Sequence, residues 1–118
     1  MSQTVPILIN LFAAVLGALG QYLYKMGAAQ LGKVPIYLNW QIGVGMTLFT
    51  VVMALFILAF KLGGRLNVVY PMYATTFIWG VLMGIYFDKE PWNSGQLIGV
   101  VLVVIGLSVI AFKSEVPA

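Results

Sequence analysis

Few side chains in this sequence can act as acids, bases, nucleophiles or metal ligands. It contains no His and no Cys, which excludes imidazole bases, thiol nucleophiles, disulfides and the common zinc sites. Its acidic residues are Asp88, Glu90 and Glu115 alone. Since no nucleophile accompanies a base, we expect a protein that is not an enzyme and that uses neither a cofactor nor a metal.

The residues best suited to bind a ligand lie in the first apolar run. Gln21 and Lys25 are four positions apart, which places an amide and an ammonium group on one face of a helix. Such groups suit the oxygens of a phosphate. Two interpretations of Lys25 remain, because it can face a polar cavity or snorkel to the membrane surface. The same face continues through Asn10, Ala14, Gly17 and Ala28.

The overall composition indicates an integral membrane protein. The chain is 62% hydrophobic and 8% charged, whereas about a quarter of the residues of a soluble domain are charged. A disordered chain would not carry this much apolar surface. The six Lys and Arg residues are too few and too dispersed to form a nucleic-acid surface, so we expect no nucleic-acid partner.

The charged residues divide the chain into uncharged runs at 1–24, 34–60, 66–87 and 91–112. A helix rises about 1.5 Å per residue, so about 20 residues cross the hydrocarbon core of a bilayer once. We therefore expect an all-α integral membrane protein whose residues 1–118 form one domain of four transmembrane helices. These helices are expected near 5–29, 39–61, 67–87 and 93–112.

The positive charges give no preferred orientation in the membrane. With four spans, each side of the membrane receives three Lys or Arg residues, and the positive-inside rule does not distinguish the sides. One interpretation is a chance tie in a small protein. The other is dual topology, in which copies insert both ways and pair antiparallel, as in transporters with inverted repeats. The two sets are Lys61, Arg65 and Lys113 against Lys25, Lys33 and Lys89.

Pro71 is the main irregularity of the third run. It cannot donate to the carbonyl of Asn67, so it either starts the helix or kinks it. Beyond it, the spacing predicts one face formed by Tyr73, Thr76, Gly80 and Gly84.

The last run carries a face of small residues. Gly95, Gly99 and Gly106 are spaced by four and seven, with Val103 between the last two. Small residues let membrane helices approach closely. We expect Gly99, Val103 and Gly106 to form a dimer contact.

No Asp or Glu lies inside a predicted span. A proton-coupled exporter of cationic drugs needs a carboxylate within the membrane, and this chain supplies none unless Glu90 dips inward. The ionisable group best placed inside a span is Lys25, with Lys61 and Arg65 near the interface. The charges therefore favour an anionic partner.

Several short motifs carry a resemblance to a known family. The segment Gly20-Gln21-Tyr22-Leu23-Tyr24-Lys25 resembles the Gly-Gln-x-x-x-Lys of small four-helix members of the drug/metabolite transporter superfamily, which includes EamA-like proteins. The likeness is greatest to the paired subunits of the aminoarabinose–phosphoundecaprenol flippase, and more distant to the small multidrug resistance family. The other matching segments are Tyr70-Pro71-Met72, Phe77-Ile78-Trp79, Glu90-Pro91 and the Gly99/Gly106 pair.

The resemblance implies a fold and a function. It implies a bundle like that of the small multidrug resistance proteins. The bundle would work either as a homodimer, whose two copies can be antiparallel, or as a heterodimer with a paralogous subunit. It implies a flippase in the bacterial inner membrane that moves an anionic lipid-linked sugar or a polyprenyl phosphate. The small multidrug resistance family has its essential Glu eight residues before the first-helix Lys, where this chain has Gly17. That departure argues against drug/proton antiport.

These considerations give a set of expected roles. We expect the first three helices to line a cavity that opens sideways to lipid, with Lys25 paired to the phosphate. The expected donors to phosphate or sugar oxygens are Gln21, Tyr70, Tyr73 and Thr76, and Arg65 and Lys61 are expected to attract the head group at one mouth.

Glu90 is expected to fix its loop by pairing with Lys89 or by capping the last helix. Two alternatives to the flippase remain: a small-metabolite or drug exporter that lacks the usual membrane Glu, and an accessory subunit of a two-component transporter.

Overall fold

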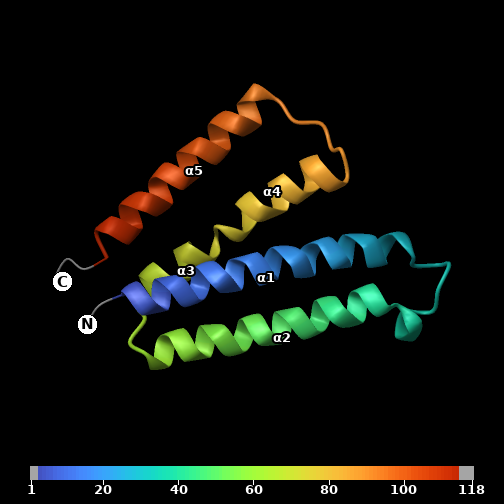
Figure 1. Ribbon diagram of the computed structural model, residues 1–118, viewed down its shortest axis with the longest axis horizontal. Coiled ribbons are helices and arrows are strands. Elements are labelled where there is room, and N and C mark those ends of the chain that lie inside the picture. The colour runs from blue at the N-terminus through green and yellow to red at the C-terminus, as the bar shows by residue number, and fades with distance from the viewer. Residues whose placement is uncertain (1–2, 115–118) are drawn as a thin grey trace.

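The computed structural model describes residues 3–114 and is helical over most of that range (Figure 1). Four helical stretches are long and apolar enough to cross a membrane, as the four uncharged runs predict. The third stretch, Leu66–Phe87, consists of two helices. The elements are α1 (Thr4–Ala29), the 3-10 helix η1 (Ile36–Leu38), α2 (Trp40–Lys61), α3 (Leu66–Tyr73), α4 (Thr76–Phe87) and α5 (Ser94–Phe112).

The break in the third stretch follows Pro71, which lies inside α3 and does not start it. Two backbone bonds of the tighter i to i+3 type close the chain there, from Ala74 N to Pro71 O (3.0 Å) and from Thr75 N to Met72 O (3.2 Å). The Thr75 hydroxyl also donates to the Met72 carbonyl, at 2.9 Å. Of the two interpretations of Pro71, a helix start is excluded because α3 begins at Leu66. The interruption lies at Ala74 and Thr75, after Pro71 and away from the Asn67 carbonyl that Pro71 leaves without its helical donor.

α1 is the central helix of the molecule. It packs against α2 along one side and against α3 and α4 along the other (Figure 1). Its buried positions are small or polar, and include Asn10, Ala14 and Gly17. The part of the predicted face that ends at Gly17 therefore packs inside the protein, whereas Gln21, Lys25 and Ala28 on the same face are exposed.

Two glycines allow α1 and α2 to interlock. A Cβ at Gly20 would lie 2.7 Å from the ring of Phe49, and a Cβ at Gly45 would lie 2.7 Å from the ring of Tyr24. The two rings stack on each other with centroids 5.2 Å apart. Each helix thus inserts an aromatic side chain over a glycine of the other, which is the close approach that small residues permit.

Buried amides fasten the two ends of this pair. At one end Asn39 accepts from Ile42 N at 3.3 Å as the N-cap of α2, and its Nδ2 donates to the Gly27 carbonyl at 2.8 Å. At the other end Gln3 donates to the Gly63 carbonyl at 3.1 Å and accepts from Arg65 N at 2.8 Å. These bonds satisfy backbone groups that the turns leave unpaired.

α5 stands apart from α4. It packs against α3 near its C-terminal end, where the Arg65 guanidinium donates to the Ser114 carbonyl, and it diverges from α4 toward the 88–93 loop (Figure 1). None of its residues is buried. Asn93 and Gln96 form a capping box at its start, so the cap expected of Glu90 is made by Asn93.

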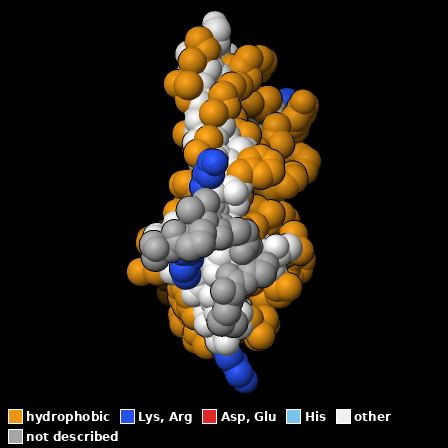
Figure 2. All heavy atoms as spheres, turned by 90° about the vertical axis from the view of Figure 1, so that its left-hand side faces the viewer, with side chains coloured by type: hydrophobic (Ala, Val, Ile, Leu, Met, Phe, Trp, Pro, Cys, Tyr) orange, Lys and Arg blue, Asp and Glu red, His pale blue; other side chains and the backbone are white. Residues whose placement is uncertain are grey.

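Apolar side chains cover much of the exterior. Figure 2 shows hydrophobic side chains over most of one edge of the molecule, with isolated Lys and Arg side chains. Large exposed residues such as Phe12, Ile57 and Leu102 lie on α1, α2 and α5. An exterior of this kind is stable in hydrocarbon and not in water. With the four helices long enough to span, it fits a multi-pass membrane protein.

Candidate functional site

A cluster of charged residues lies at the end of the molecule away from the termini. The Lys25 ammonium is 2.5 Å from Asp88 Oδ2 and 2.7 Å from Glu90 Oε2. The Tyr22 hydroxyl donates to Asp88 Oδ1 at 2.8 Å. Tyr22 and Lys25 are three residues apart on α1, so both face the loop after α4. We call these four residues the Lys25 cluster.

The loop reaches Lys25 because it turns back on α4. Lys89 has φ 54°, in the left-handed region, and Glu90 N then donates to the Gly84 carbonyl at 3.0 Å. The Glu90 carboxylate rests against Gly84, where a Cβ would overlap it. Gly84 lies in the last turn of α4, at the end of the third candidate span, so the Glu90 carboxylate folds back over the end of that span.

The partner of Glu90 corrects one expectation. The sequence suggested that Glu90 pairs with its neighbour Lys89, whereas its carboxylate pairs with Lys25. The reason is the fold-back, which aims the carboxylate at α1. The sequence analysis also missed two members of the cluster, Tyr22 and Asp88. The available signal for Asp88 was the Asp-Lys-Glu run directly after a span.

The cluster holds two carboxylates against one ammonium. Side-chain exposure is 53% for Lys25, 52% for Glu90 and 24% for Asp88, so water reaches the first two and screens their attraction. The hydrogen bonds from Lys25 and then Tyr22 hold the pKa of Asp88 below its ordinary value. Asp88 is therefore ionised near neutral pH, and the Lys25–Glu90 pair is the more accessible of the two.

A small hollow lies beside the cluster between α1 and α4. Its volume is about 150 Å³, which suits one small polar group more than a whole drug-sized ligand, for which pockets of about 300–1,000 Å³ are usual. Gln21 and Lys25 both line it, so the structure brings this expected pair together. Gly80 and Gly84 form the opposite wall.

Tyr73 lies elsewhere and fills a different space. Its hydroxyl lies against Gly17, where any Cβ would overlap it, and its ring meets Phe56 edge-on with centroids 5.0 Å apart. The space beside Gly17 is thus filled by the Tyr73 side chain.

The remaining expected ligand residues do not line the Lys25 hollow. Tyr70 is 64% exposed and contacts Phe56 edge-on at 6.4 Å, and Thr76 begins α4 after the break. Lys61 ends α2 and Arg65 precedes α3, at the end of the molecule where both termini lie (Figure 1). The cations therefore form no single site.

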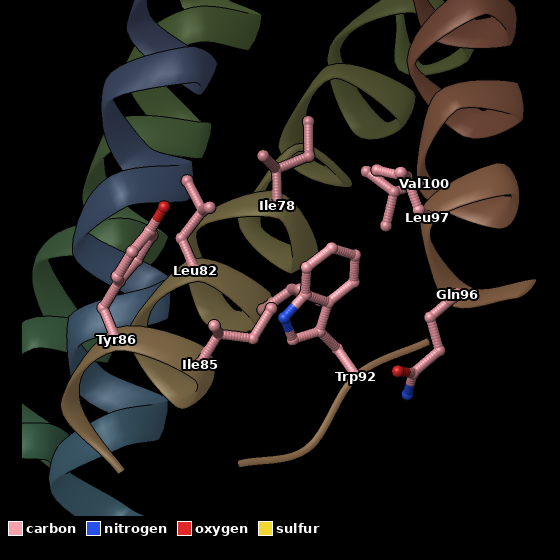
Figure 3. Close-up of a pocket in the computed structure, with 9 residues that line it drawn as sticks. Ile78, Leu82, Ile85, Tyr86, Trp92, Gln96, Leu97 and Val100 are labelled. Carbon is pink, nitrogen blue, oxygen red and sulfur yellow. The ribbon is translucent and has the colours of Figure 1, made fainter. Parts of the chain in front are cut away.

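The expected dimer contact is accessible, although two of its residues also face α4. A Cβ at Gly99 or Gly106 would meet nothing within 4 Å, and Val103 is exposed. Gly99 and Val103 line a hollow of about 380 Å³ between α4 and α5. Between α4 and α5 lies an apolar groove of about 450 Å³ (Figure 3), which the sequence did not predict.

Known proteins give no direct guide to these sites. No protein-family model, no curated protein and no solved structure matches this chain. Among residues 3–114, no three His, Cys, Asp or Glu side chains gather into a group that could hold a metal ion. The function must be argued from the Lys25 cluster and its surroundings.

Proposed function

We propose that this chain is a subunit of a membrane flippase that moves an anionic lipid-linked sugar or a polyprenyl phosphate across the bacterial inner membrane. The observation that carries the proposal is the position of Lys25. Its ammonium lies on the polar face of the central helix, beside Gln21 and at the rim of an open hollow. A phosphate there receives a charge-assisted hydrogen bond from Lys25 and an amide donor from Gln21.

In this proposal Glu90 is a counter-ion that the substrate displaces. A phosphate that takes the place of Glu90 exchanges one ion pair of Lys25 for another, and water solvates the released carboxylate. Glu90 is half exposed and can turn to water, while Asp88 stays bonded to Tyr22. Lys25 is then neutralised in both the resting and the loaded state.

A second protomer completes the site in this proposal. The hollow is open on its outer side, and a homodimer or a heterodimer with a paralogous subunit would close it in a bundle like that of the small multidrug resistance proteins. Gly99, Val103 and Gly106 on α5 form the contact. The balanced charges favour an antiparallel pair, and alternating access follows from rocking of the two inverted halves.

One observation favours a second candidate function. The cluster carries two carboxylates and one ammonium, and a carboxylate near the membrane is what a transporter of small organic cations needs. A metabolite or drug with a single ammonium group would then take the place of the Lys25 ammonium between Asp88 and Glu90.

Charge substitutions distinguish the two functions. The experiment measures the binding of polyprenyl phosphate by native mass spectrometry and the uptake of organic monocations by proteoliposomes, for Lys25→Met, Glu90→Gln and the control Lys33→Met. If the protein is a flippase, Lys25→Met lowers its affinity for polyprenyl phosphate by about tenfold or more, whereas Glu90→Gln leaves this affinity unchanged. A cation transporter loses uptake with Glu90→Gln.

Two further outcomes bear on the proposal. If Lys25→Met binds polyprenyl phosphate as well as the unmodified protein does, the phosphate pairing is wrong. If a second small membrane protein co-purifies and the purified chain flips lipid only with it, the chain is an accessory subunit.

A further inference from the structure

The groove between α4 and α5 is apolar along its length and polar at one end. Ile78 and Ile85 on α4 face Leu97 and Val100 on α5, and the Trp92 ring projects into the gap between them (Figure 3). The Gln96 amide, in the first turn of α5, is at the loop end, and the Tyr86 hydroxyl lies at the edge of the groove on α4. A ligand that matches this lining has a long apolar part and one polar end.

The groove and the Lys25 cluster meet at Glu90. A second hollow of about 380 Å³ shares Val81, Ile85, Trp92 and Val100 with the groove, and Glu90 lines it. Glu90 also lines the Lys25 hollow. The apolar groove and the charged cluster are therefore neighbours, with Glu90 between them.

We infer that the groove binds a hydrocarbon chain of a membrane lipid whose polar head lies at the Lys25 cluster. That the lipid head group is a phosphate rests on the proposed function, whereas the binding of the hydrocarbon chain in the groove does not. An amphiphile is the ligand class whose two ends match the two neighbouring surfaces. The Trp92 indole, apolar with one N–H, suits the boundary between them.

The lining of the groove distinguishes a lipid chain from a helix of a second protomer. Gly99 and Val103 of the proposed dimer contact line the adjoining hollow and not the groove itself. A second protomer seated on these two residues therefore leaves the groove of about 450 Å³ open to a hydrocarbon chain.

Quenching of Trp92 by brominated lipid tests this inference. The chain has three Trp residues, so Trp40→Phe with Trp79→Phe leaves Trp92 alone. Trp79→Phe with Trp92→Phe leaves Trp40, an exposed residue at the same end of the molecule, as a control for bulk lipid. Both proteins are placed in phosphatidylcholine vesicles that contain increasing fractions of phosphatidic acid with brominated acyl chains.

If a lipid binds in the groove, the quenching of Trp92 saturates. Half-maximal quenching of Trp92 then needs a mole fraction of brominated lipid about tenfold below that for Trp40. Val100→Phe, which fills the groove, abolishes this difference. Val101→Phe, on the next and outward-facing position of α5 (48% exposed), leaves it intact. Identical curves for Trp92 and Trp40, or no effect of Val100→Phe, overturn the inference.

If a helix of a second copy of this protein occupies the groove, lipid binding there is wrong, and cross-linking detects this case. The chain has no native Cys, so a Leu97→Cys protein labelled with benzophenone maleimide is photo-cross-linked to a second copy only if the groove faces one. Efficient cross-linking, together with equal quenching of Trp92 and Trp40, assigns the groove to a protein interface and overturns lipid binding.

Repeating the quenching with Lys25→Met separates this inference from the proposed function. Suppose that the quenching of Trp92 still saturates in Lys25→Met, and that brominated phosphatidylcholine quenches it as strongly as brominated phosphatidic acid does. The groove then holds a lipid chain, and the pairing of Lys25 with a phosphate is wrong. If Trp92 shows no saturable quenching while Lys25→Met still loses polyprenyl phosphate, the proposed function stands and the groove inference fails.

Discussion

The Glu90 carboxylate lies 2.7 Å from the Lys25 ammonium, although 65 residues separate them in the chain. This contact ties the loop after α4 to the central helix. It depends on a backbone fold-back at Lys89 and on the absence of a side chain at Gly84. The surroundings of Lys25 can therefore be altered by substitutions that leave Lys25 itself in place.

Gly84→Ala tests this dependence. We expect the added methyl group to push the Glu90 carboxylate away from Lys25, because a Cβ at position 84 overlaps it. Lys25 should then react several times faster with an amine-acylating reagent, measured by mass spectrometry of the labelled peptide. Gly80→Ala, whose Cβ would meet nothing within 4 Å, is the control. Equal labelling of the two variants would show that Gly84 does not hold the pair.

Gly17→Ala should destabilise the protein. Its Cβ overlaps the Tyr73 hydroxyl, and overpacking of this kind costs about 1–3 kcal/mol. The measurement is thermal unfolding in detergent, with Gly43→Ala as the control, because a Cβ there meets nothing within 4 Å. Adding Tyr73→Phe removes the overlapping oxygen and should restore part of the loss. A Gly17→Ala protein as stable as Gly43→Ala contradicts the packing of Tyr73 on α1.

Acidification should weaken the contribution of Asp88 to stability. Lys25 and Tyr22 lower the pKa of Asp88 in the folded protein below the ordinary value of 3.8. A lowered pKa means that the contribution is complete well above 3.8 and is lost as the pH falls through the folded value. The difference in unfolding temperature between the unmodified protein and Asp88→Asn should be constant near neutrality and shrink in acid. A difference independent of pH would falsify this account.

Asn39 should stabilise the α1–α2 pair through two separate bonds. Asn39→Ala loses the N-cap of α2 and the bond to the Gly27 carbonyl, and loss of a cap alone costs about 1 kcal/mol. Asn39→Ser keeps a capping oxygen and is too short to reach the Gly27 carbonyl, so its unfolding temperature should lie between those of Asn39→Ala and the unmodified protein. Thr47→Ala, on the exposed side of α2, is the control. A Ser variant no better than Ala contradicts the capping role.

The sequence alone determined the four spans. They follow from the length and hydropathy of uncharged runs, a property summed over about 20 residues that no single contact can reverse. In the third span the sequence marked Pro71 as an irregularity and left open whether it starts or kinks the helix, whereas the structure shows the interruption at Ala74 and Thr75. The small and polar face of α1 followed from helical periodicity, because it depends only on residues three and four apart.

The tertiary structure decided which partners these residues have. Lys25 is paired with Asp88 and Glu90 because α4 packs beside α1 and because one residue with positive φ turns the loop back. Tyr73 contacts Gly17 through the packing of α3 on α1. Composition carries no record of which helices become neighbours or of how a short loop bends. Each such contact depends on the mutual placement of segments far apart in the chain, and that placement exists only once the helices have packed.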